Sequence, residues 1–564
     1  MPRHETLRAA LTWSHDLLPD DERVLLRRLS VFAGTFSLVA AERVCTSGPL
    51  ARTSVLDLLG RLVSRSLVIA ERDQGNTRYR LLETVRQFCA ELLQASGEGP
   101  SVAASHCAYY VDLARSQDPE HASRPLTEQP TLLDRDHDNF RAALSWSIRA
   151  DPASALALAA SLWRYWFLRC HVAEGADWVE RALEAAPERT LTRAQALIGL
   201  TGLDARRGRS DRIRHQAATA VEIAADVGDR VTALRHRIVH AILVWSTFDA
   251  AEADRMASAV ARESLALGRP DLHAASSWLR AQFALTREDA ARSRAVLDGC
   301  LAELASVSVD APPFLPVITP CIVLVPIAGR LVPTYEESLI VGRRVGARQA
   351  VGYVMSAQGY AARLSGDLRS ARDAVQHAVD RFVTLGDDPG KAQALNQLGC
   401  ILRDAGDYHD ADLRFLEARE LPWRMGDRRG EWMTAGSRAL LAALRGDVDG
   451  GRAGAERALL AFEAVGDRPS IANARASLGN IELVAGRTVQ ARAHYVRAVE
   501  EFAVQSWPRI EGWHRLILAE LSEELGDAPG AEEEITRAEG LFEGQQSALA
   551  DLRVRSLRGA LLDT

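Results

Sequence analysis

Gly366-Asp367 opens a forty-residue stretch whose pattern decides the fold, because it returns at Gly406-Asp407, Gly446-Asp447, Gly486-Arg487 and Gly526-Asp527. Two columns of small residues keep the same period, at Ala371, Ala411, Gly451, Ala491 and Ala531 and at Ala378, Ala418, Ala458, Ala498 and Ala538. An aromatic column holds Phe382, Phe462, Phe502 and Phe542, and the second row has Pro422 there. Five rows without a slip indicate an internal structural repeat.

Each row predicts a hairpin of two helices. The glycine before aspartate ends the first helix, since glycine takes the left-handed conformation after a helix without steric cost. A second glycine column ends the second helix, at Gly346, Gly386, Gly426 and Gly466. Small residues in the two alanine columns let the paired helices approach closely. Three further glycines stand seven residues before the turn, where we also expect tight packing: Gly359, Gly399 and Gly479.

The repeat resembles the tetratricopeptide repeat, with longer helices than the usual unit of about 34 residues. The same pattern recurs upstream at Gly208, Gly228 and Gly268, so the resemblance extends over roughly 190 to 555. Between about 300 and 345 the phase slips around a group of prolines, and we expect an irregular repeat or a bend there. Such units bury their apolar faces only by stacking, and the stack curves into a superhelix with a concave binding face.

Residues 1–97 differ from the repeats and predict a winged-helix domain. Pro19-Asp20-Asp21-Glu22 starts a helix, because acidic residues suit the positive N-terminal end of a helix dipole. Ser54-Val55-Leu56-Asp57 has the form of a capping box that opens another helix. The apolar face of this second helix is predicted to hold Leu56, Leu59, Leu62 and Val63.

A β-hairpin and a last helix complete the predicted domain. Strands are expected at 67–70 and 77–81, on either side of the turn Asp73-Gln74-Gly75-Asn76. The helix that follows runs from Glu83 to about Ser96 and stops at Gly97. Three helices followed by a hairpin wing are the pattern of a winged helix.

Several stretches of the first 170 residues carry a family resemblance: Leu7-Arg8-Ala9-Ala10-Leu11-Thr12-Trp13-Ser14, Leu29-Ser30-Val31-Phe32-Ala33-Gly34, Arg78-Tyr79-Arg80-Leu81-Leu82-Glu83-Thr84-Val85-Arg86, Asp136-His137-Asp138-Asn139-Phe140-Arg141-Ala142-Ala143-Leu144 and Leu162-Trp163-Arg164-Tyr165-Trp166. They resemble the region after the nucleotide-binding domain in bacterial signal-transduction ATPases of the STAND class. That class includes LuxR-type and SARP/AfsR-type transcriptional regulators. The resemblance implies a role in transcription-linked signalling.

The chain departs from that family in two respects. A P-loop needs G-x-x-x-x-G-K-[ST], so that backbone amides and the lysine cradle phosphate. The only lysine, Lys391, follows Gly390, but Leu385 and Ala392 stand where the first glycine and the Ser/Thr are required. The C-terminus, which ends Leu561-Leu562-Asp563-Thr564, holds no helix-turn-helix of the LuxR type. We expect the sensor part of such a regulator, with no cofactor, no enzyme activity, and a nucleotide-binding domain on another chain as a candidate partner.

Direct DNA binding by the winged helix is the alternative reading. The helix from Ser54 to Arg65 would then be the recognition helix, with Arg61 and Arg65 as its DNA contacts. Its outward side also holds Asp57, and Leu58 is expected to add apolar exposure. Residues 1–95 contain 13 arginines and 11 acids, and this positive surplus is small for a domain that binds a polyanion such as DNA. We therefore favour the clamping of a nucleotide-binding domain, which the family resemblance implies.

Two other clusters have ordinary structural explanations. Asp134, Asp136, His137 and Asp138 contain metal-ligand types, but neighbours at one helix start diverge, and helix capping explains them better. Trp163, Tyr165, Trp166 and Phe167 could stack bases. With only two arginines nearby, we expect a packed interface between the arm and the first repeat instead. No Ser-His-Asp or Cys-His signature indicates a hydrolase.

Composition indicates a cytoplasmic helical protein. The net charge is -7 and the pI about 6.1, so the overall charge does not indicate that the whole molecule binds nucleic acid. The seven cysteines form no CxxC pair, which favours buried free thiols in a reducing compartment over a metal or redox site. The N-terminus lacks the apolar segment of a signal peptide, and prolines interrupt the apolar run from Phe314 to Val332, so no membrane segment is expected.

The sequence predicts an all-α architecture: a winged helix of three helices and a β-hairpin at 1–97, a helical arm at 98–188 and tetratricopeptide-like repeats at 189–564. The resemblance implies that the first helix of each hairpin lines the concave face. Outside the packing columns, these helices offer Gln393, Asn396, Gln397, Arg403, Arg438, Arg445, Asn473, Arg475 and Asn480. Amides and arginines suit a peptide backbone or carboxylates.

A merely solvated face would explain the same residues. We predict a non-catalytic regulatory protein that binds a protein, peptide or small ligand on this face, as part of a transcription-regulatory system. The alternatives are DNA binding by the winged helix and a generic assembly scaffold.

The missing P-loop predicts that the chain neither binds nor hydrolyses ATP. Without the lysine and the glycine-rich turn, no backbone cradle neutralises the β- and γ-phosphates. Equilibrium dialysis with labelled ATP and magnesium measures this directly, and retention of ATP at micromolar concentration contradicts the prediction.

Overall fold

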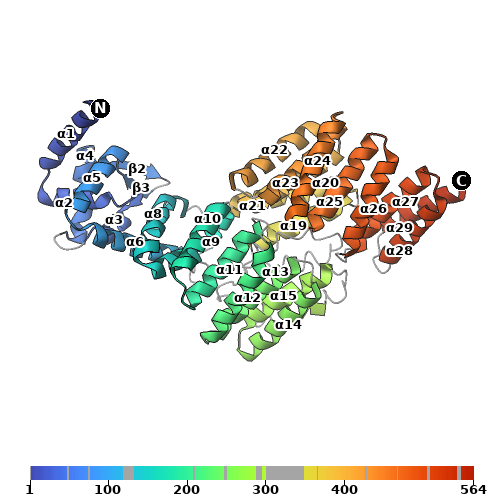
Figure 1. The fold of residues 1–564 in the computed structure, drawn as a ribbon, viewed down its shortest axis with the longest axis horizontal. Helices are drawn as coiled ribbons and strands as arrows, with labels where there is room; N and C mark the ends of the chain where they lie inside the picture. The colour runs from blue at the N-terminus through green and yellow to red at the C-terminus, as the bar shows by residue number, and fades with distance from the viewer. Residues whose placement is uncertain are drawn as a thin grey trace. The chain divides into compact units, whose positions relative to one another are not determined.

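The computed structural model describes most of the chain, in the following ranges: 2–46, 50–73, 76–117, 133–169, 171–206, 210–246, 250–286, 295–296, 298–299, 348–364, 366–385, 387–425, 428–465, 468–504, 508–542 and 548–563. Two compact units are present, Met1–Tyr165 with Asp177–Glu188, and Trp166–Ala176 with Arg189–Thr564. Helices dominate both units, and one small sheet lies near the N-terminus (Figure 1). Within the described ranges, no helix combines the length and apolarity that crossing a bilayer requires.

The predicted winged helix is present in the first unit. Its helices are α1 (Pro2–Asp16), α2 (Asp20–Leu29), α3 (Leu38–Val44), α4 (Val55–Ser64) after the 3-10 turn Arg52–Ser54, and α5 (Glu83–Ala95). The strands are β1 (Phe36–Ser37), β2 (Ile69–Asp73) and β3 (Asn76–Arg80). β3 lies between the other two and pairs antiparallel with both, with Phe36 opposite Tyr79 and Ile69 opposite Arg80. The hairpin is confirmed, whereas the two-residue strand β1 was missed because it is too short to show alternation.

Two expectations for α4 are wrong. Ser54 stands before the helix, but its hydroxyl donates to the carbonyl of Ala51 (2.7 Å) and caps no amide of α4. The apolar face consists of Val55, Leu58, Leu59 and Leu62, so Leu58 is buried and Leu56 is exposed. The 3-10 turn before α4 brings Val55 into the core, and this sets the rotation of the helix.

In the described parts of residues 99–185, four helices follow the winged helix. They are α6 (Gly99–Gln117), α8 (His137–Ala150), α9 (Pro152–Leu168) and α10 (Val172–Ala185). α6 packs against both α3 and α8, so it joins the winged helix to the arm within the first unit. The cysteines of this unit, Cys45, Cys89 and Cys107, are buried free thiols, and burial raises the pKa of Cys45 and Cys89 to about 12.

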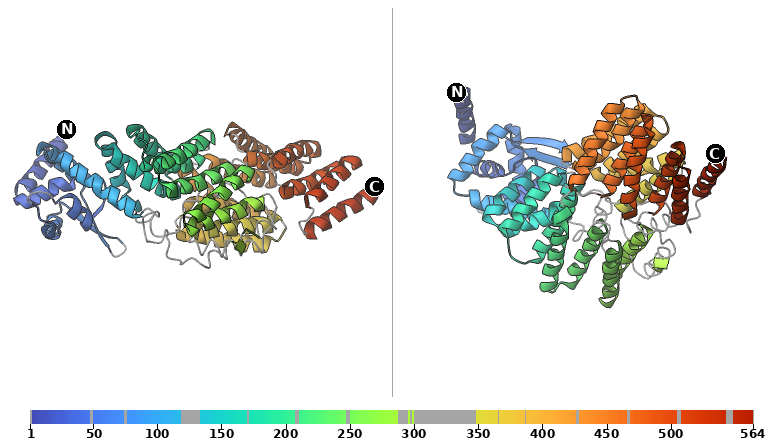
Figure 2. Two further views of the ribbon diagram at one scale, coloured as in Figure 1. Left: turned by 90° about the horizontal axis from the view of Figure 1, so that it is seen from below. Right: turned by 45° about the vertical axis from the view of Figure 1, so that its right-hand side comes forward.

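The second unit is a tetratricopeptide-like stack of helical hairpins. Its hairpins are α11 (Leu191–Arg206) with α12 (Ser210–Asp226), α13 (Arg230–Ser246) with α14 (Ala250–Ala266), α19 (Arg348–Leu364) with α20 (Leu368–Leu385), α21 (Asp388–Asp404) with α22 (Tyr408–Met425), α23 (Arg428–Leu444) with α24 (Val448–Val465), α25 (Arg468–Val484) with α26 (Thr488–Val504), and α27 (Pro508–Glu524) with α28 (Ala528–Phe542). The described residues also include α15 (Pro270–Thr286), which packs on α14, and α29 (Ala548–Asp563), which packs on α28. Within the described C-terminal hairpins, each second helix packs on the first helix of the next (Figure 2).

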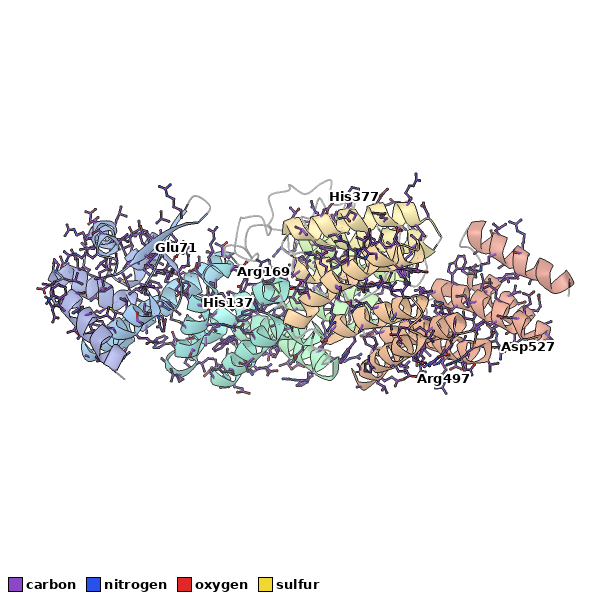
Figure 3. All side chains as sticks on the ribbon, turned by 90° about the horizontal axis from the view of Figure 1, so that it is seen from above. Glu71, His137, Arg169, His377, Arg497 and Asp527 are labelled. Carbon is purple, nitrogen blue, oxygen red and sulfur yellow. The ribbon has the colours of Figure 1, made fainter. Side chains whose placement is uncertain are left out.

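The predicted turns are confirmed where they are described. The glycines at 366, 406, 446, 486 and 526 have φ between +70° and +99°, the left-handed region that glycine enters freely. At one such turn the amides of Gly406 and Asp407 donate to carbonyls of the last turn of α21 (3.0 and 2.9 Å). The carboxylate of Asp527, labelled in Figure 3, then accepts the amide of Gly530 and begins the next helix (3.1 Å).

Some sequence expectations lie outside the described residues. These are the glycines Gly208, Gly346, Gly386, Gly426 and Gly466 and the irregular stretch between about 300 and 345.

The packing columns are also confirmed. All ten residues of the two small columns are buried, and so are the four phenylalanines of the aromatic column. A Cβ at Gly399 would lie 2.6 Å from the ring of Phe415, and one at Gly479 would lie 2.7 Å from the ring of Tyr495. These glycines therefore permit a helix contact that no other residue allows.

Ala418→Trp is expected to destabilise the stack, because Ala418 is fully buried between helices and an indole has no room there. Overpacking of this kind costs about 1–3 kcal/mol or more. Leu416→Trp is the matched control, since Leu416 is exposed on the same helix. Thermal unfolding should show a lower Tm for the first variant alone. Equal curves for Ala418→Trp and the wild type would mean that the helix register is wrong.

Candidate functional site

The proposed DNA contacts of the winged helix are paired with an acid. Arg61 and Arg65 lie 3.7 and 3.4 Å from the carboxylate of Glu22, which is buried on α2. Both arginine side chains keep about half of their surface exposed, at 61% and 44%. They can reach a phosphate only by competing with this carboxylate, so the geometry by itself does not mark α4 as a DNA-reading helix.

The wing and the arm meet at a buried ion pair. The guanidinium of Arg78 on β3 donates to both oxygens of Asp136 (2.7 and 3.3 Å), at the start of α8. The hydroxyl of Tyr110 on α6 donates to the same carboxylate (3.1 Å). Burial, with the charge of Asp136 beside it, raises the pKa of Tyr110 and keeps this donor protonated. Asp136 therefore joins three elements of the first unit.

Backbone groups complete this junction. The amide of Ala33 donates to Asn139 (3.0 Å), whose side chain donates in turn to the carbonyl of Thr35 (2.9 Å). Arg78 donates to the same carbonyl of Thr35 (2.7 Å). Three of the family-like stretches, at 29–34, 78–86 and 136–144, thus converge on one network.

Aromatic rings close the junction against water. Phe32 stacks on Phe36 with ring centroids 4.4 Å apart, and Tyr110 meets Phe140 edge to face at 5.3 Å. The ring of His106 lies between, 5.4 Å from Phe32 and 4.6 Å from Tyr110. Burial lowers the pKa of His106 to about 4, so its ring is neutral at neutral pH. We interpret the junction as structural, since its groups are buried and engaged with one another.

Two sequence interpretations change here. Asp136 occupies the position before α8, yet its carboxylate caps no amide of that helix, so the capping explanation is wrong for it. The same carboxylate is already engaged by Arg78 and Tyr110, and His137 bonds the hydroxyl of Tyr165 (3.0 Å). All four aromatic residues from Trp163 to Phe167 named above are buried, so none of them offers a platform for bases.

The first helices of the described C-terminal hairpins, α19 to α27, carry equivalent positions on one side, which we name the first-helix face. It comprises the side of α19, α21, α23, α25 and α27 that carries positions 393, 396, 397, 403 and 404 of α21 and their equivalents at forty-residue steps. α19 contacts α21, α21 contacts α23, and α23 contacts α25 directly. Arg363 of α19 donates to Asp404 of α21 (2.5 Å), which places these positions between neighbouring first helices.

Four predicted groove residues point elsewhere. Arg438 and Arg445 pair with Asp412 on the preceding second helix, at 2.9 and 3.3 Å, and Arg475 pairs with Glu463 in the same way at 2.7 Å. Asn480 accepts the hydroxyl of Tyr495 on its own second helix (2.8 Å). A first helix packs against two second helices and also against the neighbouring first helices. The sequence alone does not show which of these sides a given residue occupies.

The other predicted residues remain on the first-helix face. Gln393 is half-buried, Asn473 is exposed, and Arg403 donates to Asp404 beside it (2.7 Å). Asn396 is only 6% exposed, and its Oδ1 has no hydrogen-bond partner among the described residues. The Oε1 of Gln397 is likewise buried and unpartnered in the described part of the chain.

Two further residues with buried, unpartnered polar atoms were not predicted from the sequence. Ser356 is 3% exposed and stands forty residues before Asn396; Trp513 is 7% exposed and stands 120 residues after Gln393. The Ser356 hydroxyl and the Trp513 Nε1 lack hydrogen-bond partners within the described ranges. Both residues could have been predicted, because Ser356 shares a forty-residue column with Asn396 and Trp513 shares one with Gln393.

Unpartnered buried polar atoms cost about 1–3 kcal/mol each, and native proteins hold few of them. Here Ser356 and Asn396 occupy equivalent positions on α19 and α21, and Gln397 and Trp513 lie at neighbouring positions on α21 and α27. We therefore take the first-helix face as the candidate binding site of the repeats.

Comparison with known proteins directly supports the winged helix of the first unit. A family model for the winged helix-turn-helix domain matches residues 18–94. Proteins of Mycobacterium bovis and Mycobacterium tuberculosis that carry the name HTH-type transcriptional regulator are 45% identical over 187 residues, which is 32% of this chain and 20% of theirs. An uncharacterized protein of Mycobacterium tuberculosis is 41% identical over 103 residues, 18% of this chain and 26% of its own. The chain thus matches about a fifth of the length of the first of these relatives.

Solved structures show broader but weaker likeness. A Rap protein complexed with competence and sporulation factor has a TM-score of 0.45 at 10% identity, over 72% of this chain and 98% of its own. A STAND protein with a tetratricopeptide repeat sensor from Pyrococcus horikoshii has a TM-score of 0.30 at 13% identity, over 96% of this chain and 66% of its own. With TM-scores below 0.5, these likenesses decide nothing about this chain. The chain carries a winged helix-turn-helix domain and tetratricopeptide-like repeats, and about a third of its length is similar to proteins that carry the name HTH-type transcriptional regulator.

Asn396→Leu is expected to keep or raise the Tm, because leucine has a similar volume and removes an unsatisfied buried amide oxygen. Asn480→Leu is the matched control at a satisfied position. It deprives the buried hydroxyl of Tyr495 of its acceptor and should cost about 1–2 kcal/mol. Denaturant unfolding of both variants tests the pair. An equal loss of stability in the two variants contradicts the assignment of Asn396 as unpartnered.

Proposed function

We propose that this chain is a non-catalytic regulatory protein of a transcription-linked signalling system, and that it holds an extended segment of a peptide or protein on its first-helix face. The observation that carries this proposal is the set of unpartnered polar atoms on Ser356, Asn396 and Gln397. Polar atoms that are already buried and lack hydrogen-bond partners can bond to a ligand without first giving up bonds to water.

The chemistry of these atoms favours a polypeptide over a nucleic acid. The oxygens of Asn396 and Gln397 need donors, and a peptide backbone supplies an N–H at every residue except proline. Phosphates offer acceptors alone. Neighbouring packed helices are about 8–10 Å apart, and an extended chain covers that distance in about three residues. An extended peptide can therefore meet one first helix after another with equivalent backbone groups.

The link to transcription rests on the first unit. Residues 18–94 match the winged helix-turn-helix family, and the relatives that share 45% identity carry the name of transcriptional regulators. Those relatives extend far beyond the matched region, so we infer that this chain acts with further regulatory parts, in the same chain or in another. A nucleotide-binding domain on another chain is a proposed partner of the winged helix.

Direct DNA binding by α4 is the second candidate, and the winged helix-turn-helix match favours it. Its contacts would be Arg61 and Arg65, after release from Glu22. A generic assembly scaffold has no observation of its own in its favour.

Selection of peptides from a random twelve-residue display library on the immobilised full-length chain tests the proposal. We expect the enriched peptides to bind at least tenfold more weakly to Asn396→Leu than to the wild type. Leu416→Ala is the control, because Leu416 is exposed on a second helix and should leave binding unchanged. A labelled random DNA duplex is titrated alongside, with Arg61→Ala and Arg65→Ala as its variants.

Two results would overturn the proposal. One is the enrichment of no peptide, and the other is equal binding of the enriched peptides to the wild type and to Asn396→Leu. Tight duplex binding that these arginine variants abolish would establish the second candidate instead.

A further inference from the structure

We propose that the segment held on the first-helix face is dipolar, with acidic residues over α19 and α21, apolar residues over α23 and α25, and basic residues at α27. This inference rests on the proposed function and names the chemistry of its ligand. It comes from the charge order of equivalent positions along the face.

The last turns of the first helices carry this order. One forty-residue column reads Arg363, Arg403, Ala443, Leu483, Glu523, and the next column reads Leu364, Asp404, Leu444, Val484, Glu524. The charge along the face thus changes from basic through apolar to acidic. Every residue of these columns belongs to the last turn of its helix, so the gradient follows the stack itself.

The basic end has a surplus of one positive charge. Arg363 and Arg403 both pair with Asp404, at 2.5 and 2.7 Å. One carboxylate cannot neutralise two guanidinium groups, so a ligand carboxylate gains a charge-assisted hydrogen bond here. Arg363 also lies over the ring of Tyr360, 5.4 Å from its centroid, and this contact helps to hold the guanidinium in place.

The acidic end has no such internal compensation. Glu520 is paired with Arg553 on α29 (2.7 Å), but Glu523 and Glu524 have no cationic partner among the described residues. Among the described residues, Glu524 accepts the hydroxyl of Thr488 at the start of the preceding second helix α26 (3.3 Å), so it lies where the first-helix face borders that hairpin. Two uncompensated negative charges therefore lie beside the end of α27.

Helix stability does not explain these glutamates. The C-terminal end of a helix carries a partial negative charge, so cations stabilise it and anions destabilise it by about 0.3–1 kcal/mol each. Arg363 and Arg403 follow this preference, whereas Glu523 and Glu524 at the end of α27 oppose it. When a residue lowers the stability of its own helix, a role in binding can explain why it is present.

The middle of the face is apolar and accessible. Val484 is 41% exposed at the end of α25, and Leu483 beside it is half-buried. At equivalent positions of α23, Ala443 is buried and Leu444 packs partly against the core. An apolar stretch of a ligand would cover this surface between the two charged ends.

Unpartnered buried polar groups mark both ends of the same face. Ser356 and Asn396 lie on the helices of the basic end, and the Nε1 of Trp513 lies on the helix of the acidic end. The indole N–H needs an acceptor, which a peptide carbonyl provides. Four steps of about 10 Å separate α19 from α27, a span that about 12 extended residues cover.

The charge order is tested with the same twelve-residue display library on three full-length proteins. These are the wild type, the double variant Arg363→Glu with Arg403→Glu, and the double variant Glu523→Lys with Glu524→Lys. On the wild type we expect enriched peptides with Asp or Glu toward one end and Lys or Arg toward the other. Each double variant should bind those peptides at least tenfold more weakly and should select like charges at both ends.

Glu500→Lys is the control for charge alone, since Glu500 is exposed on the second helix α26. It should leave the affinity of the enriched peptides unchanged. Circular dichroism checks the fold of each variant. If the arginine double variant fails to fold, Arg403→Gln replaces it, and a weaker dependence of affinity on salt is then the expected result.

The outcomes separate the two proposals. Peptides that need Asn396 but show no charge order, or that bind the double variants as tightly as the wild type, overturn the dipolar ligand and leave the proposed function intact. The absence of any peptide that depends on Asn396 overturns the proposed function itself.

Discussion

The repeats depend on one constraint, the close approach of the two helices in each hairpin. At Gly399 a single added carbon would lie 2.6 Å from the ring of Phe415, so the first helix can lie against the second only because no side chain intervenes. This contact sets the rotation of the first helix about its axis. The Gly406 turn follows seven residues later, and such a turn returns every forty residues. Glycine stands at the same packing position in Gly359 and Gly479, and alanine replaces it at Ala439 and Ala519. The first-helix face consists of equivalent positions because small residues keep this place in every row.

The first unit is organised by a different interaction, the buried pair of Arg78 and Asp136. Removing two charges from water is costly, and such a pair is favourable only when other hydrogen bonds satisfy both partners. Here the hydroxyl of Tyr110 and the carbonyl of Thr35 do so. The pair therefore specifies one arrangement of wing and arm, which apolar packing alone would leave less well defined. This also explains why the family-like stretches contain arginine, aspartate and asparagine inside a core.

The first-helix face holds residues that oppose local stability. The buried oxygen of Asn396 lacks a partner within the described residues, and Glu523 and Glu524 oppose the dipole of α27. On another side of the first helices, Arg438 pairs with Asp412 across two hairpins. A surface with unsatisfied polar atoms and unpaired charges contributes less to the stability of the fold than one whose polar groups and charges are all paired. Functional surfaces commonly show this trade between stability and binding.

The sequence by itself determined the hairpins, their turns and their buried columns, because a forty-residue period repeats the same local rules five times. It also indicated α2, α4, α5 and the β-hairpin of the winged helix, whereas α1, α3 and β1 were not predicted. Tertiary structure alone decided which face of a helix each polar residue occupies. Arg438 and Arg475 face the preceding hairpin while Asn396 lies on the first-helix face, since a first helix has three packed sides and its period cannot tell them apart. The pairing of Arg78 with Asp136, 58 residues apart, was equally invisible, because only the folded chain brings a strand and a distant helix start together.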